Sequence, residues 1–451
     1  MLRHVATRLG LTLLLSLPPM LAQAAGEVTE FYLDNGMQVV VIADDRTPAV
    51  THMVWYRVGA ADEPPGLSGI AHFVEHLMFK ATDDVATGEF SRVVEANGGS
   101  DNAFVSWDYT AFFQRVAADR LGLMMQMEAD RMRDLVFDPV EVDTERSVIL
   151  EERAQRTESS AGALFNEQMR AALFLNHPYR IPVIGWRHEM ERLSADHARA
   201  FYDTWYHPNN AILIVAGAVS PDDVRALAQT HYGAIPASDR LPNRARPTEP
   251  PHIADRRVHL ADARVANPYV SIQMLAPVRE PGDQAEAAAL VYLAELLGGS
   301  GQTSLMARRL QIEEERSLYA AAFYDPTGVD PSGFSLINVP VPGLSLEEAE
   351  ADIWRMIDSL LADGIDADHF ARIRFQIEAG KIYEEDNTQS LARSWGMDLA
   401  SGLSVADIQG WPDVLAAVTP DDVMTAARRL FSDPATVTGF LLRPEPTEVS
   451  Q

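Results

Sequence analysis

Short runs of β-branched and aromatic residues alternate with longer segments of helical period along the first part of the chain. Residues 39–42 and 50–58 have the composition of strands, and residues 101–115 have the pattern of a hairpin. Apolar positions recur at helical spacing through residues 118–132 and 142–157. Strands that pair locally, with helices grouped after them, favour a largely antiparallel sheet with helices on one face. The pattern therefore predicts an α+β fold.

A second copy of this unit follows in the remainder of the sequence. A capped helix pattern that begins at Ser194 and leads into a strand-like run is repeated 225 positions later, from Thr419. A strand, a Glu-Pro turn and a helix also recur, and His72 of the first copy then matches Val291 at an offset of 219. Two similar offsets indicate a gene duplication. We expect two duplicated α+β domains, with boundaries that follow the repeat: domains at 25–235 and 256–446, a proline-rich linker at 236–255 and a tail at 447–451.

Composition narrows the class of protein without changing this picture. The chain has 451 residues, more than one hydrophobic core usually organises, and its 47% hydrophobic and 23% charged residues are ordinary for a globular protein. The formal net charge of −28 makes nucleic acid an unfavourable partner. Such acidity either serves solubility or creates an acidic chamber that attracts basic peptides, and the composition leaves both open.

The N-terminal residues have a different character from the rest. Arg3 and Arg8 precede an apolar run at 9–17, and residues 22–24 form a small-x-small cleavage pattern. The apolar run is too short to span a bilayer. We therefore expect a cleavable signal peptide at 1–24 and a mature chain, periplasmic or secreted, without a membrane span. No cysteine is present, so disulfides play no part.

The sequence His72-Phe-Val-Glu75-His76 lies in a segment of helical pattern at 68–79. Because His72 and His76 are one turn apart on one helix face, their imidazoles can bind a single Zn²⁺ ion. Glu75 lies near the same face without needing to be a ligand, so it can take a proton from an attacking water. The matching helix around Val291 lacks both histidines, which indicates that helix packing does not require them. The H-x-x-E-H order predicts the site of a zinc-dependent peptidase.

A catalytic zinc ion needs a third protein ligand, which leaves one position for water. The candidates are Glu145, Glu151 and Glu152, which all lie on the charged helix predicted at 142–157. Glu145 and Glu152 share a helix face, whereas Glu151 is turned by about 100° from Glu152. Helical spacing alone does not choose between them.

Several segments together resemble peptidase family M16, the pitrilysin-type zinc metallopeptidases. They are the His72 motif, Thr144-Glu-Arg-Ser-Val-Ile-Leu-Glu-Glu152, Gly98-Gly-Ser-Asp-Asn-Ala103, His177-Pro-Tyr179 and His207-Pro-Asn-Asn210. The resemblance covers nearly the whole mature chain and is greatest with short bacterial relatives of the mitochondrial processing peptidase. It implies two duplicated domains that form half of a clamshell chamber, with one Zn²⁺ ion per chain as the cofactor.

The resemblance also assigns roles to individual residues. The third ligand of the family is a glutamate about 76 residues after the second histidine, which corresponds to Glu152. Glu145 corresponds to a further family glutamate in an auxiliary catalytic position. Gly99, Asn102 and Ala103 match the turn and edge strand on which family members pair an extended peptide, a binding mode that suits unfolded substrates.

One departure from the family pattern concerns the second copy. Family members often carry an arginine and a tyrosine, seven residues apart, that touch the substrate across the chamber. Tyr319 matches the tyrosine, but Ile312 stands where the arginine would be, and Arg309 is a weaker candidate. Strand propensity explains Tyr319 equally well. We keep Tyr319 as a substrate-binding candidate, with an ordinary strand position as the alternative.

These inferences predict an exported zinc metalloendopeptidase that hydrolyses peptides or small unfolded polypeptides. The alternative is a noncatalytic assembly or binding subunit, because related folds serve structurally once the zinc ligands are lost. The intact set of His72, Glu75, His76 and Glu152 favours the enzyme. The resemblance permits a homodimer, or a heterodimer with a related subunit that lacks the motif.

Overall fold

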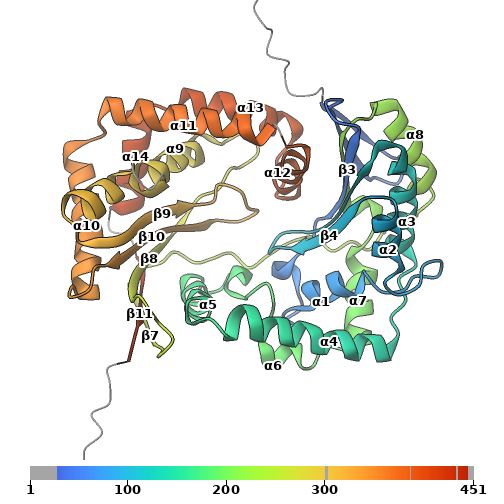
Figure 1. Cartoon of the computed structure of the whole chain (residues 1–451), viewed down its shortest axis with the longest axis horizontal. Helices are drawn as coiled ribbons and strands as arrows, with labels where there is room; N and C mark the ends of the chain where they lie inside the picture. Colours follow the sequence, from blue (N-terminus) through green and yellow to red (C-terminus); the bar gives the residue numbers. More distant parts are fainter. Residues whose placement is uncertain (1–27, 300–302, 386, 433–434, 445–451) are drawn as a thin grey trace, which may run out of the picture.

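The computed structural model describes residues 28–299, 303–385, 387–432 and 435–444. It contains two sheets, one from each half of the chain, with helices around them (Figure 1). The predicted signal peptide at 1–24 and the tail at 447–451 lie outside the described residues. Among the residues described, no helix is both long enough and apolar enough to cross a membrane.

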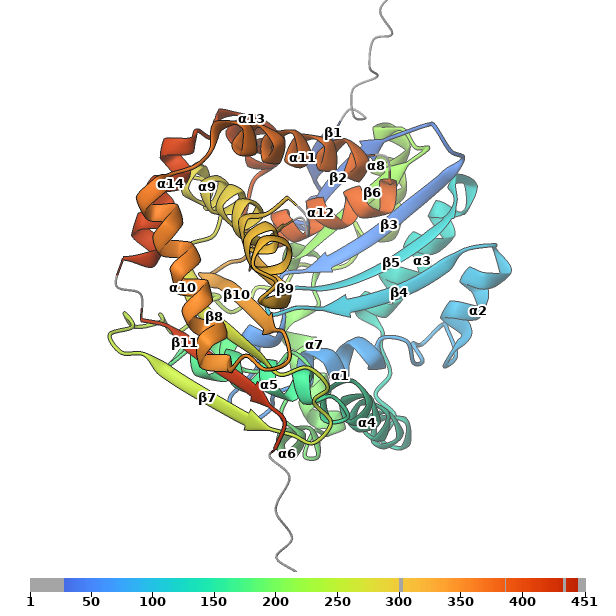
Figure 2. The same cartoon turned by 60° about the vertical axis from the view of Figure 1, so that its left-hand side comes forward.

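The five-strand order of the second sheet is repeated in the first sheet, which has one further strand at its edge. The first sheet has the order β1-β2-β6-β3-β5-β4, and the second has the order β7-β11-β8-β10-β9 (Figure 2). In each sheet one pair is parallel, β2 with β6 and β7 with β11, and the other pairs are antiparallel. The strands are β1 Val28–Tyr32, β2 Gln38–Ala43, β3 Ala49–Tyr56, β4 Ser100–Val105, β5 Thr110–Ala117, β6 Ala211–Gly217, β7 Arg256–Ala261, β8 Tyr269–Ala276, β9 Ser317–Tyr324, β10 Ser332–Pro340 and β11 Val437–Leu442. The predicted duplication is therefore confirmed.

The helices begin where the sequence supplies caps. The side chains of Ser194 and Thr419 accept backbone N–H groups at the starts of the two repeated helices, as expected for that pattern. The helices are α1 Ile70–Leu77, α2 Glu89–Ala96, α3 Leu121–Arg133, α4 Pro139–Arg153, α5 Ala161–Leu173, α6 Arg187–Met190, α7 Ala195–Trp205, α8 Pro221–His231, α9 Ala285–Ala294, α10 Leu346–Asp363, α11 Ala367–Glu385, α12 Thr388–Ala400, α13 Val405–Ala417 and α14 Pro420–Phe431. The prediction of an α+β fold with mainly antiparallel sheets is confirmed.

Each sheet buries one face under helices of its own half, as predicted. The first sheet packs against α1, α3, α7 and α8, and the second packs against α9, α10 and α14. These two apolar layers form the main cores. They hold α1 and α4 in place beneath the first sheet, near its β4 edge (Figure 2).

The opposite face of each sheet is covered by a helix from the other half of the chain. Helix α12 packs on β3 and β6 of the first sheet, and α5 packs on β7, β8 and β11 of the second. A glycine permits each close approach: a Cβ at Gly396 would lie 2.0 Å from the Trp55 ring, and one at Gly439 would lie 2.2 Å from the sulfur of Met169. The sequence pattern had predicted helices on one face only, and this exchange of helices adds a covered second face.

The predicted linker at 236–255 has no helix or strand, but several of its charged residues are bound to the rest of the chain. Arg246 pairs with Asp62 and Asp108 of the first half and with Asp330 of the second. The Glu249 carboxylate accepts three consecutive N–H groups, from residues 175–177. The segment is therefore a fixed strap that fastens the two halves to each other.

Candidate metal centre

Three side chains from two helices converge beneath the first sheet. His72 and His76 extend from α1, and Glu152 extends from α4. The Oε2 atom of Glu152 lies 3.5 Å from Nε2 of His72 and 3.2 Å from Nε2 of His76. One ligand atom from each of the three residues lies within 4.8 Å of the other two. The residues of the predicted metal site are thus together in space.

The spacing of these atoms fits a zinc ion. Donor atoms about 2.0–2.2 Å from a tetrahedral zinc lie about 3.3 Å from one another. The measured separations of 3.5 and 3.2 Å lie on either side of this value. Two imidazoles and one carboxylate are also the donor set of catalytic zinc sites, which keep a fourth position open. The side chains of His76 and Glu152 are 23% and 17% exposed, so the cluster has an accessible side.

A second set of charged groups orients the cluster. Glu145 contacts a metal-site histidine on the side away from the cluster: its Oε1 lies 2.8 Å from Nδ1 of His76. Its Oε2 lies 2.5 Å from Nζ of Lys80. Because His76 donates from Nδ1 to Glu145, its Nε2 lone pair is free to face the cluster. Arg156 holds the remaining oxygen of Glu152 at 2.8 Å. Glu145 therefore acts on the site through His76, as a positioning residue.

The protonation of the site follows from burial and from these contacts. Burial, followed by the nearby His76, lowers the pKa of His72 to about 3, so His72 is neutral and has a free lone pair at neutral pH. Burial alone would lower the pKa of His76, but its bond to Glu145 and the surrounding carboxylates raise it. Burial alone would raise the pKa of Glu145, yet its hydrogen bonds lower it. A metal ion would take the place of the proton that His76 otherwise attracts.

Glu75 lies on α1 between the two histidines and is 9% exposed. Its carboxylate makes no hydrogen bond or ion pair with any residue that the structure describes. Burial is the main reason that the pKa of Glu75 rises to about 7, and a bound cation would oppose this rise because it favours the charged carboxylate. The carboxylate is therefore free to bond a water molecule next to the cluster.

The remaining carboxylate candidate lies elsewhere on α4. Glu151 is exposed, and its side chain accepts a hydrogen bond of 3.0 Å from Gln155. It belongs to no group of metal-ligating atoms in the described part of the chain. The geometry thus agrees with the family spacing, which selected Glu152.

The predicted peptide-pairing residues lie on or next to β4, the edge strand of the first sheet. Gly99 precedes the strand, and a Cβ there would lie 2.5 Å from the side chain of Val116, so its role includes tight packing. Asn102 is exposed, and its Oδ1 accepts the N–H of Ala103 at 2.8 Å. The outer edge of β4 pairs with no other described strand.

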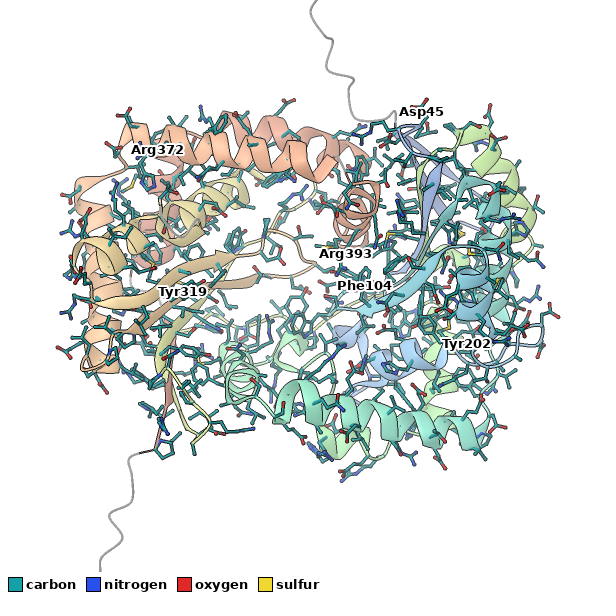
Figure 3. The ribbon with its side chains drawn as sticks, viewed as in Figure 1. Asp45, Phe104, Tyr202, Tyr319, Arg372 and Arg393 are labelled. Atoms are coloured by element: carbon teal, nitrogen blue, oxygen red, sulfur yellow. The ribbon has the colours of Figure 1, made fainter. Side chains whose placement is uncertain are left out.

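The two candidates from the second half lie apart from the metal cluster. Tyr319 is on β9, the edge strand of the second sheet, and is 45% exposed (Figure 3). Arg309 pairs with Glu314 at 3.0 Å. Neither makes a hydrogen bond or ion pair with the metal-site residues described above. Contact of Tyr319 or Arg309 with a substrate therefore stays a prediction.

The start of α1 is fixed by contacts that the sequence did not reveal. The Glu63 carboxylate accepts the N–H groups of Gly69 and Ala71 at the helix N-terminus. Gly69 has a φ of 86°, and its backbone touches that of Gly185, whose φ is 91°. Both positions require glycine, because a side chain would strain the backbone and collide with the facing chain.

The same loop is tied to the helix that carries the third ligand. Arg153, next to Glu152, donates to the Gly185 carbonyl at 2.8 Å and pairs with Glu167 at 2.8 Å. A chain of contacts therefore sets the distance between α1 and α4. Arg156 was detectable from sequence, because it is four positions after Glu152 and pairs with it. Lys80 was not, because its partner Glu145 lies on α4. Glu63, Arg153 and Gly185 were not, because their roles depend on tertiary contacts.

Replacing Gly185 with alanine is expected to weaken zinc binding about 10–100-fold, the range usual for residues that orient metal ligands. The new Cβ would lie 2.6 Å from the Ser68 carbonyl and 2.7 Å from Gly69, so the start of α1 must move. Competition with a chromophoric chelator measures the affinity.

Gly66 provides the matched control, because its φ is 85° and a Cβ there meets nothing within 4 Å. Gly66→Ala should cost only the roughly 1–2 kcal/mol of a left-handed backbone. Equal zinc affinity in the two variants would contradict the proposed coupling between the loop and the ligands.

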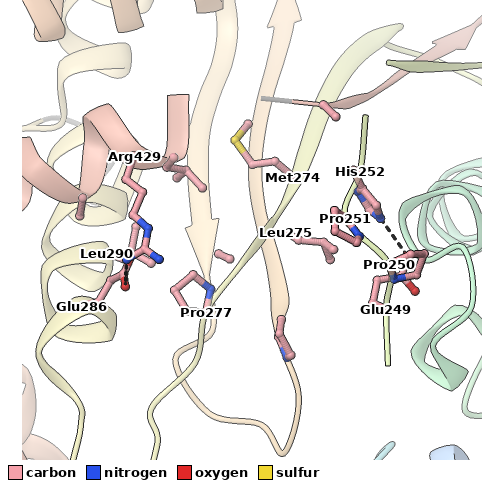
Figure 4. A pocket seen from close by; sticks show the side chains of 15 residues that line it. Glu249, Pro250, Pro251, His252, Met274, Leu275, Pro277, Glu286, Leu290 and Arg429 are labelled. Atoms are coloured by element: carbon pink, nitrogen blue, oxygen red, sulfur yellow. Dashed lines mark hydrogen bonds and ion pairs between the residues drawn. The ribbon is translucent and has the colours of Figure 1, made fainter. Parts of the chain in front are cut away.

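A separate groove of about 460 Å³ lies between the strap, β8, α9 and α14 (Figure 4). Its charged side chains are paired with each other: Glu249 with His252 at 2.8 Å, and Glu286 with Arg429 at 2.7 Å. None of its lining residues comes from α1 or α4. The groove is therefore distinct from the metal cluster.

Comparison with known proteins gives consistent matches. The family model for insulinase (peptidase family M16) matches residues 38–186, and the model for the peptidase M16 inactive domain matches residues 192–377. The zinc protease PqqE of Helicobacter pylori is 28% identical over 417 residues, covering 91% of each chain. An uncharacterized zinc protease of Mycobacterium leprae is 32% identical over 356 residues, covering 76% of each. The crystal structure of a protease from Helicobacter pylori matches with a TM-score of 0.86 at 26% identity, over 93% of this chain and 100% of that one.

Proposed function

Because the chain belongs to peptidase family M16, we propose that this zinc-dependent peptidase is an exported metalloendopeptidase that hydrolyses peptides or small unfolded polypeptides. The observation that carries the proposal is the convergence of His72, His76 and Glu152, with the free carboxylate of Glu75 beside them. A noncatalytic binding subunit would need at most the three zinc ligands, and it would not need a free carboxylate beside them. The unpaired Glu75 has a use in hydrolysis.

Each residue of the centre has a definite task in this reaction. His72, His76 and Glu152 would hold a zinc ion, which would act as a Lewis acid on the scissile carbonyl and make the attacking water more acidic. Glu75 accepts the proton of the attacking water and returns it to the leaving amine. Glu145 keeps the His76 ring in position through its Nδ1–H.

The substrate is proposed to bind as an added strand on β4. An extended peptide held by main-chain hydrogen bonds is recognised with little dependence on its sequence, which suits a peptidase of unfolded chains. The Ala103 N–H, which Asn102 covers, becomes one of the donors once that side chain turns away. Gly99 keeps the start of the strand close to its neighbours.

Location and assembly are part of the same proposal. The signal-peptide pattern at 1–24 supports export to the periplasm or the medium. One zinc ion per chain is expected, and a second subunit, either identical or related and without the motif, would close the chamber. Peptides are the proposed substrates in either assembly.

The test uses the purified mature chain, alone and with a co-expressed related subunit. Zinc content should be about one ion per chain, and a set of internally quenched peptides should be hydrolysed. A chelator should abolish turnover, and added zinc should restore it. Zinc-loaded protein that cleaves none of the peptides, alone or paired, would favour the noncatalytic binding subunit instead.

A further inference from the structure

A cavity of about 390 Å³ lies between the two halves of the chain, outside the metal centre. Residues 106–109, α5 and Tyr179 line it on the side of the first half, and β8, β10 and residues 325–333 line it on the other. Residues 106–109 follow directly on Val105, the last residue of β4. A peptide extended along β4 would thus have one end at this cavity. The volume fits a few residues and not a folded domain.

Arg170 of α5 lies in the cavity wall without a polar partner. Its guanidinium stacks on Trp107, with Cζ 3.9 Å from the ring centroid. It makes no hydrogen bond or ion pair with any described residue. Burial lowers the pKa of Arg170 to about 10, and the nearby Tyr179 and Asp325 only partly oppose this shift.

A second arginine flanks the same end of β4. Arg393 of α12 lies over Phe104, with Cζ 4.0 Å from the ring centroid (Figure 3). It too makes no hydrogen bond or ion pair with a described residue. Arg393 is one helical turn before Met397, which lines the cavity. Each of these two arginines thus stacks on an aromatic ring near this end of β4 without a hydrogen bond or ion pair to a described residue, in a chain whose net charge is −28.

None of the described acidic groups of the cavity forms an ion pair with Arg170. Asp108 is paired with Arg246 and accepts the Tyr179 hydroxyl at 2.5 Å. Asp330 pairs with the same arginine and lies 3.0 Å from His177. Asp325 accepts the N–H of Thr327 and forms no ion pair with Arg170. Asp325 therefore acts on Arg170 through its charge, but no described residue accepts a hydrogen bond from the Arg170 guanidinium.

We propose that the cavity is a carboxylate-binding subsite, in which Arg170 receives the C-terminal carboxylate or an acidic side chain of a bound peptide. The inference rests on the proposed peptidase function. A guanidinium matches a carboxylate with two parallel N–H···O bonds, and stacking on Trp107 already fixes the plane of the donor. The subsite selects acidic peptides, the opposite of what the net charge of the chain suggests.

The test measures binding without cleavage, in zinc-loaded full-length Glu75→Gln protein. The probes are three N-acetylated eight-residue peptides of alanine, glycine and serine: a free acid, its C-terminal amide, and the amide with one glutamate. Isothermal titration calorimetry gives each dissociation constant. At least one carboxylate probe should bind about tenfold tighter than the neutral amide, the usual effect of a charge-assisted hydrogen bond.

Substitutions then assign the preference to a residue. Arg170→Gln should bring the preferred probe to the affinity of the neutral amide, and Arg170→Lys should retain part of the preference. Arg225→Gln is the matched control, because Arg225 also stacks on an aromatic ring, with Cζ 3.7 Å from the Phe31 centroid, but is exposed on α8. Asp325→Asn should strengthen binding of the carboxylate probe, since it removes a nearby negative group.

The outcomes distinguish a C-terminal carboxylate from an acidic side chain, and they test the subsite separately from the peptidase function. A preference for the free acid alone assigns the C-terminus, and one for the glutamate probe alone assigns an acidic side chain. Equal affinities for all probes, or an unchanged preference in folded Arg170→Gln or Arg170→Lys, overturns the subsite. If wild-type protein cleaves peptides in that case, the peptidase function stands without it. Arg170-dependent binding without hydrolysis would leave the subsite and remove the function.

Discussion

Replacing Glu75 with glutamine is expected to reduce peptide hydrolysis about 10²–10⁴-fold while zinc stays bound. This loss corresponds to about 3–5 kcal/mol of transition-state stabilisation. Glutamine keeps the shape of the side chain but cannot accept the proton of the attacking water. No other residue depends on this carboxylate, since Glu75 makes no hydrogen bond with a described residue, so the fold should be retained.

The measurement compares zinc content, peptide affinity and turnover in wild-type protein and Glu75→Gln under the same conditions. Peptide affinity should be unchanged, because pairing on β4 does not involve Glu75. Glu95→Gln, an exposed change on α2, controls for the loss of one negative charge. Equal turnover in wild type and Glu75→Gln, with zinc present in both, would remove Glu75 from the mechanism.

The second large effect is expected at the third ligand. Glu152→Gln should weaken zinc binding by more than the 10–100-fold typical of residues behind the ligands, because it replaces an anionic donor with a neutral one. The two remaining histidines cannot hold the ion tightly against a chelator. Zinc retained after dialysis against a graded series of chelator concentrations measures the loss.

Glu151→Gln is the matched comparison, one position earlier on the same helix. Its side chain contacts Gln155 and not the histidines, so zinc affinity should stay close to that of the wild type. A larger loss in Glu151→Gln than in Glu152→Gln would show that α4 presents a different face to α1.

The sequence predicted the parts of the site that depend on one helix. His72, Glu75 and His76 share a single turn pattern, so their proximity followed from helical geometry. The choice of Glu152 required the family spacing, because it depends on how α4 lies across α1. That packing is set by Arg153 and Gly185, whose contacts join segments 32 residues apart in sequence.

The fold shows a similar division. The duplication and the strands at 39–42, 50–58 and 101–115 were predicted from the pattern, because they depend only on composition and spacing, whereas β1 and β7 were not predicted. The pattern could not say which sheet α5 and α12 cover, because an apolar helix face fits any apolar surface of suitable shape. The strap at 236–255 was read as a linker for the same reason: its prolines indicate no regular structure, but they do not reveal the pairing of Arg246 across both halves.

The exchange of α5 and α12 has a consequence for how the chain reaches its native state. The outer face of the first sheet stays uncovered until residues 388–400 have been synthesised, because α12 is the helix that packs on it. Domains usually fold in order as they emerge from the ribosome, but here the first half has to wait for most of the second. Neither half completes its layers alone, so the unfolding of either half should uncover an apolar sheet face of the other. A chain that remains unfinished until late in its synthesis also stays open to chaperones for longer than two sequential domains would.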